Sequence, residues 1–376
     1  MGEISVWTKK YVLLCKAIRT LPEKWHGLQD PEIRHRHRCL DLIMNPDVKK
    51  VFIFRGKIIS AIREYFEKNG FLEVEIPLLQ PVYGGAKAKP FKTYINAFHM
   101  DMYLSISPEL YLKRAVVGGL ENVYTICKNF RNEGVDKTHN PEFTMMECYS
   151  AYKDYEDMMK ITEEIYNYVA KKVLGTTKIE YQGKKINLSA PWKRLTMIDA
   201  IKKYARVNIK DMADEEIKKV LEENRIELEE GYNRGLAIEA IFEELVQPKI
   251  IQPTFITNHP KETSPLCKQW RKDPDYLERF EPFINGCEVG NGYTELNDPI
   301  LQRKLMVEQA KKLKRGLEAH PLDEDFLIAM EYGMPPTGGL GLGIDRMVMF
   351  LTNAPSIRET IMFPTVKPRE KTYSET

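Results

Sequence analysis

The stretch VYTICKNFRNEGVDKTHNPEFTMMECYS, residues 123–150, constrains the fold of this chain more than any other. Residues 123–130 and residues 142–150 are rich in β-branched and aromatic side chains, whereas residues 132–140 between them are polar. Two such segments joined by a polar loop predict an antiparallel hairpin with a long, charged tip. We therefore expect a sheet of antiparallel strands rather than a series of βαβ units.

Helical and alternating segments precede the hairpin. Residues 51–66 place apolar side chains at helical spacing, and Asn69-Gly70 then supplies a stop, so a helix is expected there. Residues 71–77 alternate at period two and end at Pro77, which cannot donate to a central ladder and therefore closes or edges a strand. Residues 2–21 predict one or two further strands, although no partner strand follows them directly.

Both kinds of element also follow the hairpin. Residues 155–174 predict a helix with acidic residues early and Lys171-Lys172 late, the order that a helix dipole favours. Residues 193–250 are expected to be mostly helical, with residues 211–230 at the surface. Residues 280–297 alternate again, and the glycine-rich residues 337–343 lead into a helical run at residues 344–351. The expected fold class is α+β.

The composition excludes several classes of protein. Over 376 residues, 56 Lys and Arg nearly balance 54 Asp and Glu, which excludes a protein that coats polyanions through bulk charge. No run approaches 18 apolar residues and the first residues lack the features of a signal peptide, so no membrane association is expected. Six cysteines are scattered without a CxxC pair, which favours reduced thiols in the cytoplasm.

The predicted hairpin carries a concentrated set of polar side chains. In and beside its loop lie Arg131, Glu133, His139, Asn140 and Glu147, with Phe143 between them. Buried carboxylates next to an arginine are either an ion pair that holds two strands together or a clamp for a ligand. The structural role is favoured for each residue alone, whereas the set as a whole favours a ligand site.

Two more polar groups lie further along the chain. Glu281 and Glu288 share a strand face only if a bulge or turn intervenes, and carboxylates without histidine or cysteine partners suit Mg²⁺ that bridges phosphates. Two carboxylates on the rim of an edge strand are an equally weighted alternative. Asn291, Tyr293 and Glu295 point the same way if their segment is a strand, and such a line suits a small cationic ligand.

The glycine-rich run at residues 338–343 is weak evidence for a dinucleotide fold. It does not fit the GxGxxG pattern and lacks a βαβ context. Arg346 follows it at the start of a predicted helix, where a guanidinium is well placed to meet a phosphate. This position therefore favours phosphate binding.

Together these segments resemble the three signature motifs of class II aminoacyl-tRNA synthetases, and specifically of the lysyl enzymes. Residues 70–77 resemble motif 1, with Pro77 at a dimer interface; residues 130–134 and 139–147 resemble motif 2; residues 341–346 resemble motif 3. Residues 84–86, 107–113 and 288–298 are also typical of the family. The resemblance implies an antiparallel sheet flanked by helices that holds ATP in a bent conformation.

The resemblance also implies roles for the candidate residues. Arg131 would grip the α-phosphate and the lysine carboxylate, and Arg346 would meet the γ-phosphate, which makes both catalytic. The other ATP-binding residues would be Glu133, His139, Asn140 and Phe143, with Phe143 stacked on adenine, together with Glu281 and Glu288 as carriers of Mg²⁺. The lysine-binding residues would be Gly85 and Glu109 at the α-amino group, Asn291 at the carboxylate, and Tyr149 and Glu295 at the ε-ammonium, with Glu147 and Tyr293 lining the pocket.

The N-terminal end departs from the lysyl enzymes. Residues 1–45 are expected to be an extension, the remnant of an OB-fold anticodon-binding domain and its linker, because a five-stranded barrel cannot be built from one or two strands. Residues 46–376 are expected to form the catalytic domain. The run Arg34-His35-Arg36-His37-Arg38 is interpreted as a solvated helix face, with contact to tRNA as a hypothesis.

The implied function is activation of lysine with ATP to lysyl-adenylate and transfer of lysine to the 3′ end of tRNA, in a homodimer that contacts the tRNA acceptor end. One alternative is a paralogue that passes activated lysine to a protein or another carrier. Another is a non-catalytic regulator that binds lysine. The joint presence of Arg131, Glu281, Glu288 and Arg346 disfavours the regulator, which has no physical need for all four.

Overall fold

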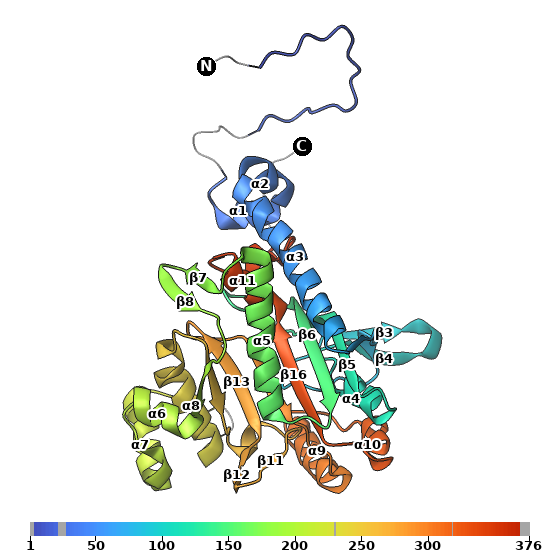
Figure 1. The fold of residues 1–376 in the computed structure, drawn as a ribbon. Coiled ribbons are helices and arrows are strands. Elements are labelled where there is room, and N and C mark those ends of the chain that lie inside the picture. The colour runs from blue at the N-terminus through green and yellow to red at the C-terminus, as the bar shows by residue number, and fades with distance from the viewer. Residues whose placement is uncertain (1–3, 22–27, 229–230, 318, 369–376) are drawn as a thin grey trace.

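A computed structural model gives the fold, and it describes residues 4–21, 28–228, 231–317 and 319–368. Its largest feature is a sheet in which nine strands of the described residues take part (Figure 1). Most neighbours are antiparallel, as expected, and parallel pairs close the two ends. The order is β1 (Leu72–Glu73), β5 (Asn122–Phe130), β6 (Glu142–Ala151), β16 (Thr337–Gly343), β15 (Gly290–Thr294), β13 (Arg279–Ile284), β10 (Thr254–Thr257) and β9 (Lys193–Thr196), with β14 (Cys287–Glu288) beside β13.

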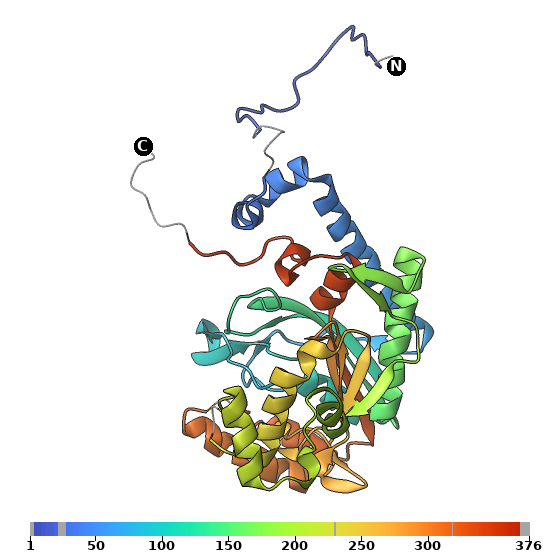
Figure 2. The ribbon, with the colours of Figure 1, turned by 90° about the vertical axis from the view of Figure 1, so that its left-hand side faces the viewer.

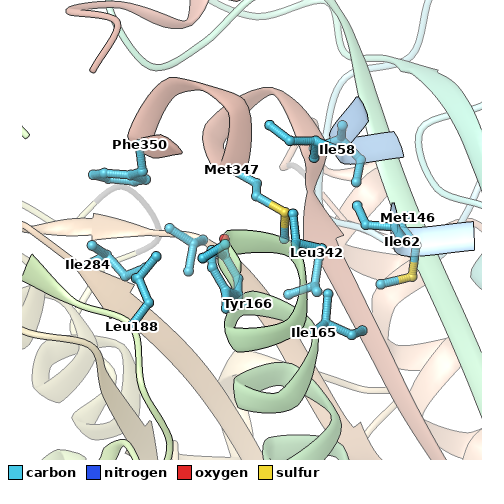
Figure 3. Close-up of a cluster of buried hydrophobic side chains, with 14 of the residues drawn as sticks. Ile58, Ile62, Met146, Ile165, Tyr166, Leu188, Ile284, Leu342, Met347 and Phe350 are labelled. Atoms are coloured by element: carbon cyan, nitrogen blue, oxygen red, sulfur yellow. The ribbon is translucent and has the colours of Figure 1, made fainter. Parts of the chain in front are cut away.

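One face of the sheet is covered by α3 (Pro46–Lys68), α5 (Tyr155–Leu174) and α11 (Ile344–Leu351). The main hydrophobic core lies between these helices and the central strands (Figure 3). Ile62 of α3, Tyr166 of α5 and Leu342 of β16 are fully buried there. Burial of one large apolar side chain contributes roughly 1.5–3 kcal/mol, so this core holds the centre of the sheet rigid.

The helix at residues 155–174 has the bounds predicted from the sequence, and local signals explain them. The Asp154 side chain accepts hydrogen bonds from the first turn, and the Asp157 side chain accepts one from the backbone N–H of Asp154, which completes a capping box. Gly175 ends the helix in the left-handed conformation at φ +74°. The hairpin at residues 123–150 is likewise confirmed as β5 and β6, paired from Asn122↔Ser150 to Phe130↔Glu142.

Further helices and small sheets surround the main sheet. The helices α6 (Met197–Tyr204), α7 (Asp214–Asn224) and α8 (Arg234–Leu245) pack in a second core with Phe283 of β13. On another side lie α4 (Glu109–Val117), α9 (Pro299–Lys314) and α10 (Glu324–Glu331). One small sheet has three strands in the order β2 (Leu79–Gln80), β4 (Met100–Leu104) and β3 (Lys92–Ile95). Two others are hairpins, one of β7 (Lys178–Tyr181) and β8 (Lys184–Asn187) and one of β11 (Gln269–Trp270) and β12 (Asp273–Leu277). The short 3-10 helices are η1 (Asn96–Phe98), η2 (Ile209–Asp211), η3 (Gln247–Lys249) and η4 (Lys261–Thr263).

The strand prediction for residues 2–21 is wrong for the described residues 4–21, which form no strand. Figures 1 and 2 show them running away from the sheet, and the side chains of Ile4 and Leu14 are more than nine-tenths exposed. A strand needs a hydrogen-bonded neighbour, and alternation alone does not supply one. Residues 2 and 3 lie outside the described residues.

The predicted strand at residues 71–77 is real but shorter, since β1 pairs with β5 only at Leu72↔Val123 and Glu73↔Tyr124. It lies at the edge of the main sheet, as the proline predicted. The domain boundary after residue 45 stays a prediction. No helix among the described residues is both long and apolar enough to span a bilayer.

The run from Arg34 to Arg38 is not a solvated helix face. It spans α1 (Pro31–Arg36) and the start of α2 (Arg38–Met44), and Arg38 is 1% exposed. Arg38 pairs with the buried Asp41 at 2.5 Å, and Arg34 pairs with Asp41 at 2.9 Å and with Glu359 of α12 (Ile357–Thr360) at 3.1 Å. These charges therefore tie the N-terminal helices to the C-terminal one.

Candidate active site

A cavity of about 360 Å³ lies on the face of the sheet opposite α5. Successive residues of a strand point to opposite faces, so Met146 and Cys148 of β6 enter the main core while Glu147 and Tyr149 line the cavity. Gly339, Gly341 and Gly343 of β16 line the same cavity. One face of the central strands thus supports the fold and the other forms the site.

All candidate site residues predicted from the sequence line this one cavity, although their individual roles stay predictions. They come from the loop between β2 and β3, from α4, from the β5–β6 hairpin, from β13 to the residue after β15 and from α11. The set is Gly85, Glu109, Arg131, Glu133, His139, Asn140, Phe143, Glu147, Tyr149, Glu281, Glu288, Asn291, Tyr293, Glu295 and Arg346.

Two arginines mark one end of the cavity. The Arg131 guanidinium lies 5.1 Å from the centre of the Phe143 ring, and burial lowers its pKa. Arg346 donates to the backbone oxygen of Glu288 at 2.5 Å and lies 3.3 Å from the carboxylate of the same residue. Its other nitrogen is 3.5 Å from Nε2 of His139. Two cations held beside each other in this way suit an anion with several charged oxygens, such as a polyphosphate.

Asp345 fixes the start of α11, where Arg346 lies. Its Oδ2 accepts a hydrogen bond from the backbone of Thr144 at 2.7 Å, and its Oδ1 is paired with Arg55 of α3. Arg55 also donates to the Thr144 hydroxyl at 2.9 Å. A single buried carboxylate therefore joins α3, β6 and α11 directly behind the two arginines.

Glu281 and Glu288 meet because a tight turn separates them. Asn285 and Gly286 have φ of +50° and +74°, and these positive values are those of the two-residue type I′ hairpin. The turn pairs Phe283 with Glu288 across β13 and β14. Burial raises the pKa of Glu281 to about 8; Arg279 opposes the rise and the charge of Glu288 adds to it. Only oxygen donors are present in this pair, which fits a hard divalent cation.

Arg279 is a cavity residue that the sequence reasoning missed. Its side chain is buried, pairs with Glu281 at 2.6 Å and with Glu239 of α8 at 3.7 Å, and donates to Asn291 at 3.3 Å. A usable signal was present, since residues two apart on a strand share a face and Arg279 precedes Glu281 by two. Its link to α8 has no local signal.

The opposite end of the cavity is acidic. Burial raises the pKa of Glu147 to about 8, the charge of Glu109 adds to the rise, and hydrogen bonds from Ser107 at 2.9 Å and Tyr149 at 3.1 Å oppose it. Burial likewise raises the pKa of Glu109, and it raises the pKa of Glu295 to about 8 against the charge of Lys113. Three buried carboxylates in mutual electrostatic contact favour a cationic ligand.

Lys113 is the second residue that sequence reasoning missed. Its ammonium, fully buried, lies 2.5 Å from Glu109 and is also ion-paired with Glu295. Neither oxygen of Glu295 receives a well-aligned hydrogen bond from a described residue. The spacing of Glu109 and Lys113, four residues apart on a helix, predicts that pair, but nothing local predicts Glu295 as the other partner.

Two glycines keep the acidic end open. A Cβ on Gly339 of β16 would collide with the carboxylate of Glu295 and come within 2.6 Å of the Tyr149 ring. Gly85 has φ +84°, and a Cβ there would lie 2.7 Å from the Ser107 hydroxyl. The glycine run of β16 is therefore a strand that leaves room for its neighbours, rather than a loop around phosphates.

Comparison with known proteins gives consistent matches. The family model described as tRNA synthetases class II (D, K and N) matches residues 30–367. A lysine–tRNA ligase of Thermoanaerobacter sp. (strain X514) is 54% identical, over 98% of this chain and 74% of the relative. Lysine–tRNA ligases of Pelotomaculum thermopropionicum and Carboxydothermus hydrogenoformans are 54% and 52% identical, each over 98% of this chain and over 74% and 76% of the relatives.

Proposed function

The chain belongs to the class II tRNA synthetases (D, K and N), and from that premise we propose that it activates lysine with ATP and charges tRNA with it. In the first step a lysine carboxylate oxygen attacks the α-phosphorus of ATP, and pyrophosphate leaves. In the second step a terminal hydroxyl of tRNA attacks the lysyl carbonyl, and AMP leaves. Both steps depend on positioning and charge stabilisation more than on a strong general base.

We assign the phosphate chemistry to the end of the cavity that holds the two arginines. Arg131 contacts the α-phosphate and the lysine carboxylate, so that it offsets the charge that develops between them. Arg346 binds the γ-phosphate and so holds the leaving group in line. Phe143 stacks on adenine, and Glu133, His139 and Asn140 complete the nucleotide site.

An ATP-dependent synthetase implies a divalent metal, and we propose that it is Mg²⁺ held by Glu281 and Glu288. The fit rests on their oxygen donors and on the raised pKa of Glu281, to which the charge of Glu288 contributes. A bound dication favours the ionised form of both carboxylates. When bound, Mg²⁺ neutralises charge on the phosphates during transfer.

The observation that carries the choice of lysine is the acidic end of the cavity. Glu109 with the Gly85 backbone takes the α-ammonium, and Glu295 with Tyr149 takes the ε-ammonium. Glu147 and Tyr293 line the space between them, and Asn291 holds the carboxylate. Leaving a buried carboxylate without its cation costs roughly 3–5 kcal/mol, so amino acids with neutral side chains are rejected.

We extend the proposal to the assembly and its acceptor. The tRNA binds through its acceptor end, and two copies pair through the surface around β1 and Pro77, since closed homodimers are the commonest assemblies. The cytoplasm stays our predicted compartment. The two alternatives considered from sequence, a non-tRNA acceptor and a non-catalytic regulator, have no support in the relatives described above.

The experiment is ATP–pyrophosphate exchange with each of the twenty amino acids, followed on the same sample by charging of total tRNA. We expect lysine alone to support rapid exchange, and tRNA to accept it. Exchange with lysine but no charging would remove the second step from the proposal. Absence of exchange with lysine would remove both steps.

A further inference from the structure

Lys113 occupies an unusual place for a lysine. Its ammonium is fully buried and touches the two carboxylates, Glu109 and Glu295, that the proposed function assigns to the two ends of the substrate. One carboxylate is enough to balance the charge of a buried ammonium. Lys113 instead lies between two groups that also have to serve a ligand.

Three side chains near Lys113 are uncharged near pH 7 and do not change the charge balance of the pocket. His320 lines the cavity, and burial together with the charges of Lys113 and Lys87 lowers its pKa to about 4, so it is uncharged near pH 7. Burial raises the pKa of Cys267 well above its usual value, and the Phe326 ring lies 5.9 Å from the ammonium. None of these three side chains adds a charge.

The other cations of the cavity have their main partners outside the set of Glu109, Glu147 and Glu295. Arg279 pairs with Glu281 and Glu239, and the charge of Lys87 acts on Glu239 and His320. Arg131 also acts on Glu147, but the charges of Glu133 and Glu288 influence it more, and the proposed function assigns it to the α-phosphate and the lysine carboxylate. The carboxylates of the acidic end are Glu109, Glu147 and Glu295, and Lys113 is the buried ammonium paired with two of them.

We propose that Lys113 is a specificity-determining residue that sets the charge the pocket accepts. Three carboxylates and one fixed ammonium leave space for two positive charges; free lysine carries two ammonium groups, and its carboxylate is assigned above to Arg131 and Asn291. The inference rests on the proposed function. Lys113 acts as a positioning residue through Glu109 and Glu295, and it differs from those two because no bond to the substrate is assigned to it.

Two substitutions and their combination test this balance. Lys113→Met removes the fixed ammonium, Glu147→Gln removes one carboxylate at nearly constant shape, and the double variant removes both. The KM for lysine and the KM for ATP are measured by pyrophosphate exchange for each protein, with a thermal melt to verify folding. We expect each single substitution to raise the KM for lysine at least tenfold, with the KM for ATP within about twofold of wild type.

The double variant distinguishes charge balance from structural support. We expect its KM for lysine to be at least threefold lower than that of Glu147→Gln, because two carboxylates then face two substrate charges again. If Lys113→Met does not fold, the KM for lysine of the double variant, compared with that of Glu147→Gln, still tests the inference. A double variant no better than Glu147→Gln overturns the inference alone, whereas wild-type protein without lysine-dependent exchange overturns the proposed function as well.

Discussion

The molecule buries charge in two places, and the two differ in how that charge is balanced. Between α2 and α12, hydrogen bonds and charges from Arg34 outweigh burial and lower the pKa of Asp41, and those of His35 and Arg34 do the same for Glu359. In the cavity, burial raises the pKa of both Glu147 and Glu295 to about 8. A lowered carboxylate pKa means that the hydrogen bonds and cations of the fold outweigh the cost of burial, and a raised one means that burial prevails in the absence of further positive charge.

The largest expected effect is a loss of activity in the cavity without a loss of stability. Arg346→Ala should lower lysine-dependent exchange about a thousandfold, because one donor aimed at developing charge is worth that much in a dry site. The Arg346 side chain lines the cavity and does not belong to the hydrophobic core, so the free energy of unfolding should change by less than about 1 kcal/mol. Exchange kinetics and urea unfolding measure both quantities.

Arg303→Ala is the matched control for that variant. Arg303 of α9 pairs with Glu324 and Glu331 on the outside of α10, far from the chemistry assigned above. Its removal should leave exchange unchanged. Exchange by Arg346→Ala within tenfold of wild type would contradict the assignment of the γ-phosphate to Arg346.

The second prediction concerns the buried ion pairs of Asp41 with Arg34 and Arg38. Asp41→Asn should lower the free energy of unfolding by about 3 kcal/mol, since it leaves Arg38 buried without its carboxylate. Exchange per folded molecule should stay the same. Asp47→Asn, which loses an exposed pair with Lys50, is the control and should cost less than about 0.5 kcal/mol in urea unfolding. Equal losses in the two variants would mean that burial of the cluster contributes nothing.

The third prediction is that removal of a cavity carboxylate, unlike removal of Asp41, does not lower the free energy of unfolding. Glu147→Gln should leave the ligand-free protein equally stable or more stable by up to about 1 kcal/mol, because an amide keeps hydrogen bonds without a buried charge. The same change should weaken lysine binding about tenfold. Urea unfolding and isothermal titration with lysine measure the two effects. A loss of stability as large as that of Asp41→Asn would erase the distinction between the two clusters.

The smallest expected effect is a pH dependence. The ordinary pKa of a glutamate is 4.5, and those of Glu147 and Glu295 are raised to about 8, so the folded protein retains protons that the unfolded chain has released between these values. Stability of the ligand-free protein should therefore fall as pH rises through this window. Bound lysine favours the ionised carboxylates and should remove this slope.

Thermal melts at pH 6, 7 and 8, with and without lysine, test that dependence. The rise in melting temperature caused by lysine should grow with pH, by a few degrees in all. Asp41 and Glu359 give the opposite trend. Because their pKa values are lowered in the folded protein, they stabilise the fold above about pH 4, and this contribution is lost in acid. A lysine-induced shift that is constant with pH would contradict the raised pKa of the cavity carboxylates.

Local signals in the sequence predicted the elements that local chemistry determines. The bounds of α5 follow from Asp154 and Gly175, and the β5–β6 hairpin follows from two apolar strands around a polar loop. The line of Asn291, Tyr293 and Glu295 was predicted from period two and does face one cavity. In each of these the information lies within a few residues of the element.

Partners far apart in the chain were not predictable in the same way. Arg38 was interpreted as solvated because its environment is built from α12, more than three hundred residues later. Lys113 of α4 was passed over because its second partner, Glu295, follows β15 in a distant part of the chain. The apolar alternation at residues 4–21 predicted strands that lack a neighbour. Burial of a charge is a property of the packed chain, and periodicity does not report it.

The tight turn at Asn285-Gly286 has a consequence for how the site assembles during folding. Glu281 and Glu288 are brought together within one hairpin, and hairpins of this kind close in about 1–10 μs. Glu109, Lys113 and Glu295 meet only after the chain between α4 and β15 has folded back, which is slower because distant segments have to find one another. We expect pulsed hydrogen exchange to show protection of the β13–β14 hairpin before that of β15 and β16. In the proposed assignment, a chain caught between these two stages has the metal end of its site but cannot yet distinguish lysine from other amino acids.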